Sequence, residues 1–267
     1  MEDERCLCLA LHLSNKFLTE RVRRQWNAAG SLRSLAHVLL GEKFPEIMKR
    51  ASIYFKDLDI LAVTDADYPP LLREIDHAPF ALFLKGQRAL LKKKLVSIVG
   101  TREPSDAGRQ ATARVAAHFA GNDGFTVVSG IARGVDAIAH HAALDAGGST
   151  IAVLPNGFAH FYPLENRDLY ALAGSSPELL LVSEYPPEQK PQKHHFVRRN
   201  RIIAGLAELT IITEAGIKSG AMITANHALR EGRDVAAIRT AAPMRNEGGE
   251  RLLNDGAIDL SRLAFPV

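Results

Sequence analysis

The sequence predicts an α/β fold in which a doubly wound, mostly parallel sheet follows a small helical module. From residue 95 onward, short apolar runs rich in β-branched residues alternate with amphipathic helical segments. This alternation is typical of βαβ units, whose right-handed crossovers place helices on both faces of a parallel sheet. The chain has 267 residues, 46% of them hydrophobic and 24% charged. These values are typical of a soluble globular protein with one or two domains.

The N-terminal segment has helical periodicity. Thr19 is expected to cap a helix that ends near Gly30, because a Thr side chain satisfies free amides and a Gly permits the left-handed turn at a helix end. We therefore predict a helical module over residues 1–62 and a Rossmann-like domain over residues 63–267.

The strands of the second domain are expected where apolar runs end abruptly at polar or glycine residues. The predicted strands are 95–100, 125–130, 150–154, 179–184, 209–214 and 234–238. In an open α/β sheet, ligands bind at the carboxyl ends of the strands. The residues that follow each strand are therefore the first candidates for a binding site.

The first strand ends at Gly100 and a helical segment follows. Thr101, Arg102 and Ser105 offer donors that suit a phosphate at the start of a helix,. The spacing is not that of a dinucleotide-binding motif, because Gly100 and Gly108 are eight residues apart,. The P-loop motif, with its lysine, is also missing. We predict a phosphate-binding turn and no nucleotide cofactor.

Two further turns have similar chemistry. The predicted phosphate-binding turns comprise Ser129, Gly130, Arg133 and Gly134 after the second strand, and Ser219 and Gly220 after the fifth. Lys218 also follows the fifth strand, and we add it as a cation that suits the phosphate groups of an anionic ligand. Glu214 ends that strand. We interpret it as a structural acid that accepts backbone N–H groups or pairs with an arginine, in preference to a catalytic acid.

Positive charge is densest in residues 188–201, which hold five Lys or Arg residues and one aromatic residue, Phe196. Cations that follow phosphates and a ring that stacks on a base are the combination used to bind single-stranded nucleic acid. We therefore predict a surface loop that binds nucleic acid, with Lys193, Phe196, Arg198 and Arg199 as contacts, and a helix that starts near Arg199. A structural role for part of this helix stays open, in which an Arg or Asn of residues 199–201 ties adjacent loops together.

Other site types are disfavoured. Cys6 and Cys8 have no partners placed to complete a zinc site, so no metal is predicted,. Asp136 and His140 are interpreted as a structural pair. The N-terminus is acidic where a signal peptide would be basic, and the apolar run at 6–13 is too short to span a membrane,. We therefore expect a cytoplasmic protein with no membrane association.

Several motifs follow one another in the order of a known family. They are Ser97-Ile-Val-Gly-Thr-Arg102, Ser129-Gly-Ile-Ala-Arg-Gly-Val-Asp136, Tyr162-Pro163, Ser183-Glu-Tyr-Pro186 and Phe196-Val-Arg-Arg-Asn-Arg201. In these motifs the chain closely resembles the bacterial DNA-processing protein A family (DprA/Smf). The resemblance implies an extended Rossmann fold and a homodimer that binds single-stranded DNA. It also implies that the protein protects incoming DNA and loads the RecA recombinase during natural transformation, without being an enzyme.

The resemblance also carries over particular residues. It implies a DNA pocket formed by Arg102, Lys193 and Phe196, with a further basic residue at or near Arg233. Many family members carry a C-terminal winged-helix domain, which we do not expect here because the chain ends soon after the sheet. Two alternatives remain open. One is a nucleotide-processing enzyme of the LOG phosphoribohydrolase type, with Arg102 and Glu214 in its active site, and the other is a sensor of small nucleotides.

Overall fold

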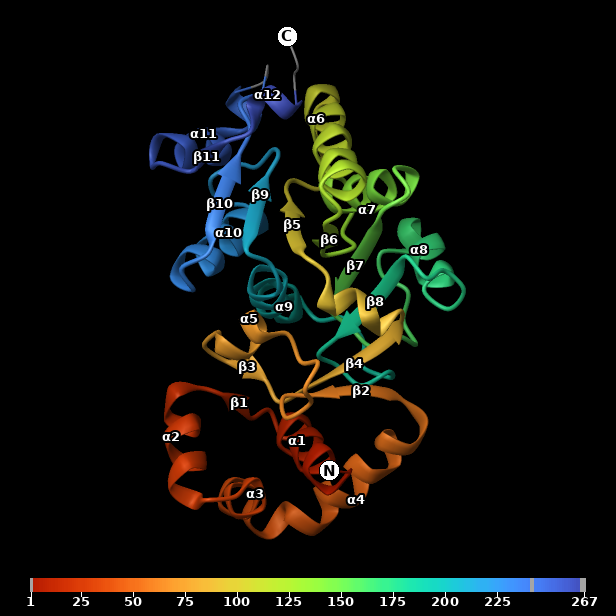
Figure 1. Cartoon of the computed structure of the whole chain (residues 1–267), viewed down its shortest axis with the longest axis vertical. Helices are drawn as coiled ribbons and strands as arrows, with labels where there is room; N and C mark the ends of the chain where they lie inside the picture. The colour runs from red at the N-terminus through yellow and green to blue at the C-terminus, as the bar shows by residue number, and fades with distance from the viewer. Residues whose placement is uncertain (1, 241–242, 265–267) are drawn as a thin grey trace. The chain divides into compact units, whose positions relative to one another are not determined.

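A computed structural model describes residues 2–240 and 243–264 of the chain (Figure 1). It divides into two compact units, residues 1–84 and residues 85–267. The division falls later than the predicted boundary after residue 62. Residues 63–84 group with the first unit because β4 (Ala81–Gly86) pairs antiparallel with β2 (Asp59–Ala62).

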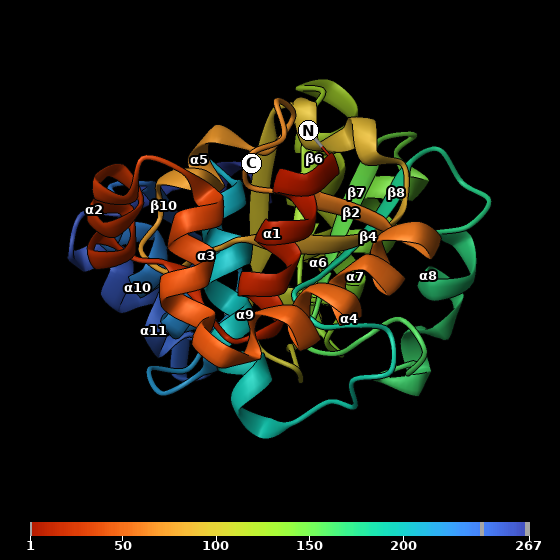
Figure 2. The ribbon, with the colours of Figure 1, turned by 90° about the horizontal axis from the view of Figure 1, so that it is seen from below.

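The first unit is mainly helical. Its helix α1 packs against both α3 and α4 (Figure 2). Thr19 caps α2 by accepting the Val22 N–H, and Gly30 ends that helix with φ = 70°, as predicted. The elements of this unit besides β2 and β4 are α1 (Glu2–Leu13), β1 (Phe17–Leu18), α2 (Glu20–Ala29), α3 (Leu32–Leu40), η1 (Gly41–Lys43), α4 (Phe44–Asp57), α5 (Pro70–Glu74) and β3 (Ala78–Pro79).

The second unit is built on a parallel sheet. Its strands lie in the order β11-β10-β9-β5-β6-β7-β8, and every pair whose register is defined among them is parallel. The strands are β5 (Leu95–Val99), β6 (Thr126–Ser129), β7 (Ser149–Leu154), β8 (Leu179–Ser183), β9 (Leu209–Ile212), β10 (Asp234–Ala237) and β11 (Ile258–Asp259). All six predicted strands are present, and the short β11 was not predicted.

Helices cover both faces of this sheet, which confirms the doubly wound, Rossmann-like fold. Val96 and Ile98 of β5 belong to a core that includes residues of α6 and α7. Between them, the Ser97 hydroxyl donates to the Ile203 carbonyl of α9, on the opposite face. The helical elements are η2 (Arg88–Lys92), α6 (Asp106–Ala117), the π-helical turn η3 (His118–Asn122), α7 (Val135–Asp145), η4 (Leu164–Asn166), α8 (Arg167–Leu172), α9 (Lys193–Leu206), α10 (Gly220–Arg230), η5 (Pro243–Arg245), α11 (Glu247–Asn254) and α12 (Ser261–Ala264).

The strand order reverses direction between β5 and β9. From β5 the chain continues to β6, β7 and β8 on one side, and β9, β10 and β11 lie on the other. Such a reversal leaves a crevice at the carboxyl ends of the two central strands. The turns after β5 and β9 are therefore placed to form a binding site. Among the described residues, no helix is long and apolar enough to cross a membrane.

Candidate nucleic-acid interface

A groove of about 690 Å³ lies at this reversal point, within the second unit. Three segments that are far apart in the sequence line it: the turn after β5, the first turns of α9 and the start of α10. From these segments the groove includes Gly100, Thr101 and Arg102; Lys193, Phe196, Val197 and Asn200; and Ser219, Gly220 and Ala221. The fold thus brings together much of the predicted DNA-binding set.

Lys193 and Phe196 lie on a helix, where a surface loop was predicted. Helix α9 begins at Lys193, directly after Gln192, whose backbone is extended. Residues three and four apart share one face of a helix, so Lys193, Phe196, Val197 and Asn200 all face the groove. The prediction failed because the basic, Pro-containing composition of the segment hid its helical periodicity.

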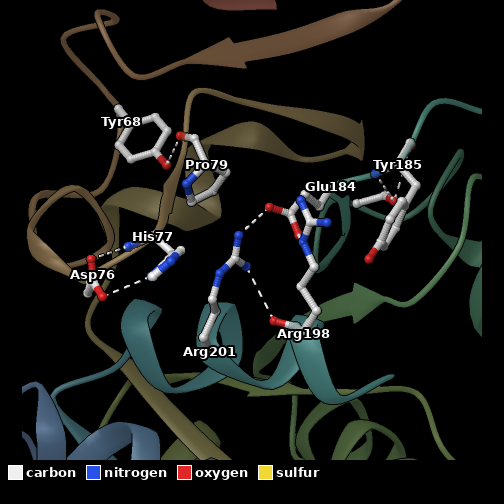
Figure 3. A network of polar contacts seen from close by, with 9 residues as sticks. Tyr68, Asp76, His77, Pro79, Glu184, Tyr185, Arg198 and Arg201 are labelled. Atoms are coloured by element: carbon white, nitrogen blue, oxygen red, sulfur yellow. Dashed lines mark hydrogen bonds and ion pairs between the residues drawn. The ribbon is translucent and has the colours of Figure 1, made fainter. Parts of the chain in front are cut away.

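The opposite side of α9 contacts Glu184, which is almost fully buried after β8. Arg198 Nε lies 3.2 Å from one carboxylate oxygen, and Arg201 donates to the other (Figure 3). Arg198 was predicted to contact DNA, but the structure pairs it with Glu184, away from the groove lining. The correction follows from the helix, because Arg198 is only two residues from Phe196 and so lies on a different face.

One end of the groove combines a cation with two aromatic rings. The guanidinium carbon of Arg102 lies 5.5 Å from the centre of the Phe196 ring, and the Tyr162 ring lies 5.5 Å from the same ring at an angle of 71°. Arg102 is exposed and Tyr162 is 42% exposed. Tyr162 was not among the predicted site residues. Its signal in the sequence was an aromatic residue in the loop after a predicted strand.

A smaller pocket of about 330 Å³ shares Arg102, Tyr162 and Phe196 with the groove. Its other walls are mostly apolar and include Ile131, Pro155 and Leu164. Arg133 and Glu165 also line it, and their charged groups lie 3.7 Å apart. Arg133, predicted to bind phosphate, therefore lines this pocket instead of the larger groove. A pocket with apolar walls and a few polar groups suits a flat aromatic ligand such as a nucleobase.

The predicted phosphate turn at Ser105 is already filled by the protein. The Ser105 N–H donates to a carboxylate oxygen of Glu214 over 2.9 Å, and the Ser105 hydroxyl donates to the other oxygen. That hydroxyl also caps α6 by accepting the Gly108 N–H. Because Ser105 uses its donors internally, it is not available to an external phosphate. Glu214 is fully buried, which confirms its interpretation as a structural acid.

Ser129 is not among the residues that line the groove, whereas Arg199 lines it although its side chain is almost fully buried. The Ser129 hydroxyl is buried and donates to the Ile98 carbonyl over 2.6 Å. Arg199 is 4% exposed, and its guanidinium donates to the carbonyls of Gly130 and Val153. These donors are already used by carbonyl groups of the protein, so the fold does not favour the predicted DNA or phosphate contacts of the two side chains. Arg199 instead joins α9 to the ends of β6 and β7.

Burial disfavours the charged forms of both Arg199 and Asp136. It lowers the pKa of the Arg199 guanidinium, although the charge of Asp136 acts in the opposite direction. Burial likewise raises the pKa of Asp136, although Arg199 and the backbone N–H of Ala132 favour its charged form. Asp136 and Arg199 therefore support each other's ionised forms in the lining of the groove,.

Gly100 and Gly134, in the turns after β5 and β6, allow the backbone segments around them to pack closely. Gly134 has φ = 77°, and a Cβ at this position would lie 2.5 Å from the carbonyl carbon of Arg102. Next to it, the Val135 N–H donates to the Thr101 carbonyl over 3.1 Å. A Cβ at Gly100 would lie 2.6 Å from the Val135 side chain. These turns therefore fix the Arg102 loop against α7.

The start of α10 is open to the groove. Ser219 and Gly220 line it. The atom nearest to the point where a Gly220 Cβ would stand is Asn200 Nδ2, at 4.0 Å. The Ser219 hydroxyl is buried and has no hydrogen-bond partner among the described residues. Lys218 is exposed immediately before it. The first amides of a helix attract anions, so this segment retains the chemistry predicted for it.

Arg233 is not part of the groove. It follows the C-terminal end of α10 and precedes β10, where it lines a separate pocket with Asp234 and Arg251. The 11 residues of α10 place about 16 Å between this turn and the start of the helix. The structure does not bring Arg233 together with the other predicted DNA-binding residues, and a DNA contact at Arg233 stays a prediction.

Asp136 and His140 are both structural, but they bond to different partners. Asp136 accepts the Ala132 N–H, and His140 Nδ1 lies 2.6 Å from the Thr150 hydroxyl. The Thr150 hydroxyl donates to the Val127 carbonyl, so its oxygen accepts a hydrogen bond from His140 Nδ1–H. Within the described part of the chain, no group of three His, Cys, Asp or Glu residues is placed to hold a metal ion.

The sequence of the chain is similar to those of several known proteins. Residues 59–264 match the family described as DNA recombination-mediator protein A. The chain is 34% identical to the DNA processing protein DprA of Bacillus subtilis (strain 168) over 275 aligned positions, which cover 96% of this chain and 92% of that protein. It is 41% identical to the DprA of Streptococcus pneumoniae (strain ATCC BAA-255 / R6) over 204 positions, covering 76% and 71% of the two chains.

Two solved structures are also similar. The X-ray structure of DprA from Streptococcus pneumoniae superposes with a TM-score of 0.78 at 35% identity, over 90% of this chain and 88% of that one. DNA processing protein A from Helicobacter pylori, whose structure is described in terms of a single-stranded DNA binding mode, superposes with a TM-score of 0.68 at 28% identity, over 78% and 93%. The chain therefore belongs to the DNA recombination-mediator protein A family, the DNA-processing proteins called DprA or Smf.

Proposed function

We propose that this protein binds single-stranded DNA along the groove at the carboxyl ends of β5 and β9. The observation that carries the proposal is the cluster of Arg102, Phe196 and Tyr162, with Lys193 one helical turn from the ring. A cation and a partly exposed ring at one place can neutralise a phosphate and stack on the adjoining base. This pair of contacts requires a base that is free of its complementary strand.

The rest of the groove supports a path for a sugar–phosphate backbone. Lys193 is an exposed cation at the start of α9, and Lys218 is an exposed cation two residues before α10. The first residues of α10 line the groove. Contacts of this kind position a nucleic acid but do not read its bases. We therefore expect binding with little sequence preference.

Family membership extends the proposal to a cellular role. The relative from Helicobacter pylori is described by its single-stranded DNA binding mode, and the matched family is named for mediating recombination. We infer that this protein is a cytoplasmic homodimer that protects incoming single strands and loads the RecA recombinase onto them during natural transformation. In this role it acts as a binding protein without catalytic turnover.

The groove does not favour the enzyme alternative. A phosphoribohydrolase of the LOG type would need Glu214 at the substrate, but this carboxylate is fully buried and bound by Ser105. Arg102 alone supplies charge but no acid or base for cleavage of an N-glycosidic bond. Binding without cleavage is the function that the geometry supports.

The deciding experiment compares single strands of increasing length with duplex of the same length. Fluorescence anisotropy should show affinity that rises with strand length and that exceeds the affinity for duplex. Tight binding of a mononucleotide with no dependence on length would instead support the nucleotide sensor. Release of free base from a mononucleotide would support the enzyme.

A double variant tests the position of the site. Arg102→Ala combined with Lys193→Ala removes two exposed cations of the groove. The matched control is Lys92→Ala, which removes an exposed lysine just before β5, at the opposite end of this strand from the groove. We expect the double variant to lose most of its affinity and the control to retain it. Equal losses in the two proteins would show that the DNA does not follow the groove.

A further inference from the structure

The two helix starts at the reversal point differ in what occupies them. Parallel sheets commonly present such helix starts to phosphates, because the first amides and the helix dipole favour negative charge. At α10 the helix start faces the groove. At α6 the corresponding place, which we call the α6 anion seat (the amides and side chain of Ser105 and the helix start up to Gly108), holds the carboxylate of Glu214.

The α6 anion seat is closely fitted to this carboxylate. Glu214 is fully buried, and a Cβ at Gly108 would lie 2.3 Å from one of its oxygens. Only glycine at position 108 therefore leaves room for the acid. At Gly220, by contrast, the nearest atom to a Cβ lies 4.0 Å away. One helix start is thus filled by the protein itself, and the other is left to a ligand.

Glu214 also holds the loop that carries Arg102. Its backbone carbonyl accepts the Thr101 N–H over 2.8 Å, and its carboxylate accepts the Ser105 N–H. These bonds fix the loop on both sides of Arg102, whose guanidinium then lies over the Phe196 ring. The same residue therefore fills the seat and orients the cation of the groove.

We propose that Glu214 is an internal substitute for a bound phosphate and determines the ligand class of the groove. It closes the α6 anion seat to the terminal phosphate of a mononucleotide, while it holds Arg102 in place for the backbone of a strand. The part of this proposal that concerns DNA rests on the proposed function. The occupation of the seat by an anion of the protein does not, and it can be tested without DNA.

The test uses Glu214→Ala, which empties the seat, and Glu214→Gln, which fills it with a neutral group of the same shape. Thermal unfolding is followed as sodium phosphate replaces sodium chloride at constant ionic strength. Phosphate at ten times its Kd should raise the Tm of Glu214→Ala by about 3–6 °C. The shift in the Tm of the wild type measures phosphate bound elsewhere, including at α10. The shift in the Tm of Glu214→Gln should not exceed that of the wild type.

A shift in Glu214→Ala no larger than that of the wild type would overturn the proposal, as would an equal shift in Glu214→Gln. A shift with sodium acetate but not with phosphate would show that the seat accepts only a carboxylate, and would overturn its role in excluding nucleotides. If Glu214→Ala is recovered unfolded, refolding yields in phosphate and chloride give the same comparison. Failure of the wild type to bind single strands would refute the proposed function and leave the seat result unaffected.

Discussion

The ring of Phe196 gives the sharpest test of the proposed binding of DNA in the groove. Phe196 is partly exposed on the first turn of α9, and its ring lies 5.5 Å from both the Arg102 guanidinium carbon and the centre of the Tyr162 ring. In Phe196→Ala the cations stay in the groove while the stacking surface is lost. The variant therefore separates base stacking from phosphate neutralisation.

The magnitude follows from the contacts that the ring can make. Stacking of a base on an aromatic side chain contributes about 1–3 kcal/mol, and the cation–π contact that orients Arg102 adds about 0.5–1 kcal/mol at an exposed position. We therefore expect Phe196→Ala to weaken single-strand binding by about 10- to 1,000-fold. The dependence of affinity on salt should stay unchanged, because no phosphate contact is removed.

The assay is fluorescence anisotropy with a labelled single strand at several salt concentrations. The matched control is Phe161→Ala, which removes a neighbouring ring that is 50% exposed and packs against Tyr170, outside the residues that line the groove. An affinity of Phe196→Ala within about twofold of the control would refute the stacking role of this ring. A flatter salt dependence would show that the substitution also moved a cation.

Three further outcomes are expected. Tyr162→Ala should weaken single-strand binding by about 3- to 30-fold, since a second base can stack beside Phe196; duplex affinity falling equally would contradict this. Arg199→Met should lower the free energy of unfolding by about 3–5 kcal/mol in urea, because it leaves Asp136 buried without its cation; a loss below about 1 kcal/mol would contradict it. Burial lowers the pKa of His140 to about 3, so stability present above the unfolded pKa of about 6.5 should be lost as pH falls, by up to about 1.4 kcal/mol per unit. His140→Leu should flatten this slope, and an unchanged slope would exclude His140 as its source.

Local signals were sufficient for most of the fold. The strands from β5 to β10 begin and end within two residues of the predicted positions, because buried parallel strands are continuous apolar runs bounded by turn residues. The cap at Thr19 and the left-handed end at Gly30 were also readable, since each depends on one residue and its neighbours along the chain.

The site was less predictable because its polar residues are used by distant partners. Ser105 bonds to Glu214, 109 residues away, and Arg199 bonds to Gly130, 69 residues away. A sequence indicates that such side chains suit a phosphate, but it does not show whether the protein itself supplies the anion or the carbonyl. The structure separates donors that face the groove from donors that the fold has already used.

Helix α9 shows the consequence for the charge of the groove. The segment 188–201 has five Lys or Arg residues, but the helix directs Arg198 and Arg201 to Glu184 and buries Arg199. The proposed phosphate contacts are Arg102 and Lys193, which line the groove, and Lys218 beside it, whereas the exposed Lys190 of the same segment is not among the residues that line the groove. Each contact with a single strand contributes about −0.7 to the slope of log K against log salt, so the wild type should show a slope of about −2.

The slope of log K against log salt shows whether only the cations on the groove face of α9 contact phosphates, or all five basic residues of the segment. If all five cations of the segment met phosphates, the slope would be about −3.5 before Arg102 is counted. Lys193→Ala should reduce the slope by about 0.7, whereas Arg198→Ala, a change of the same charge on the opposite face of α9, should leave it unaltered. A wild-type slope steeper than about −3, or equal effects of the two substitutions, would show that the helix face does not select the cations. Affinity should therefore depend more on ring stacking and on the start of α10 than on the number of basic residues in the sequence.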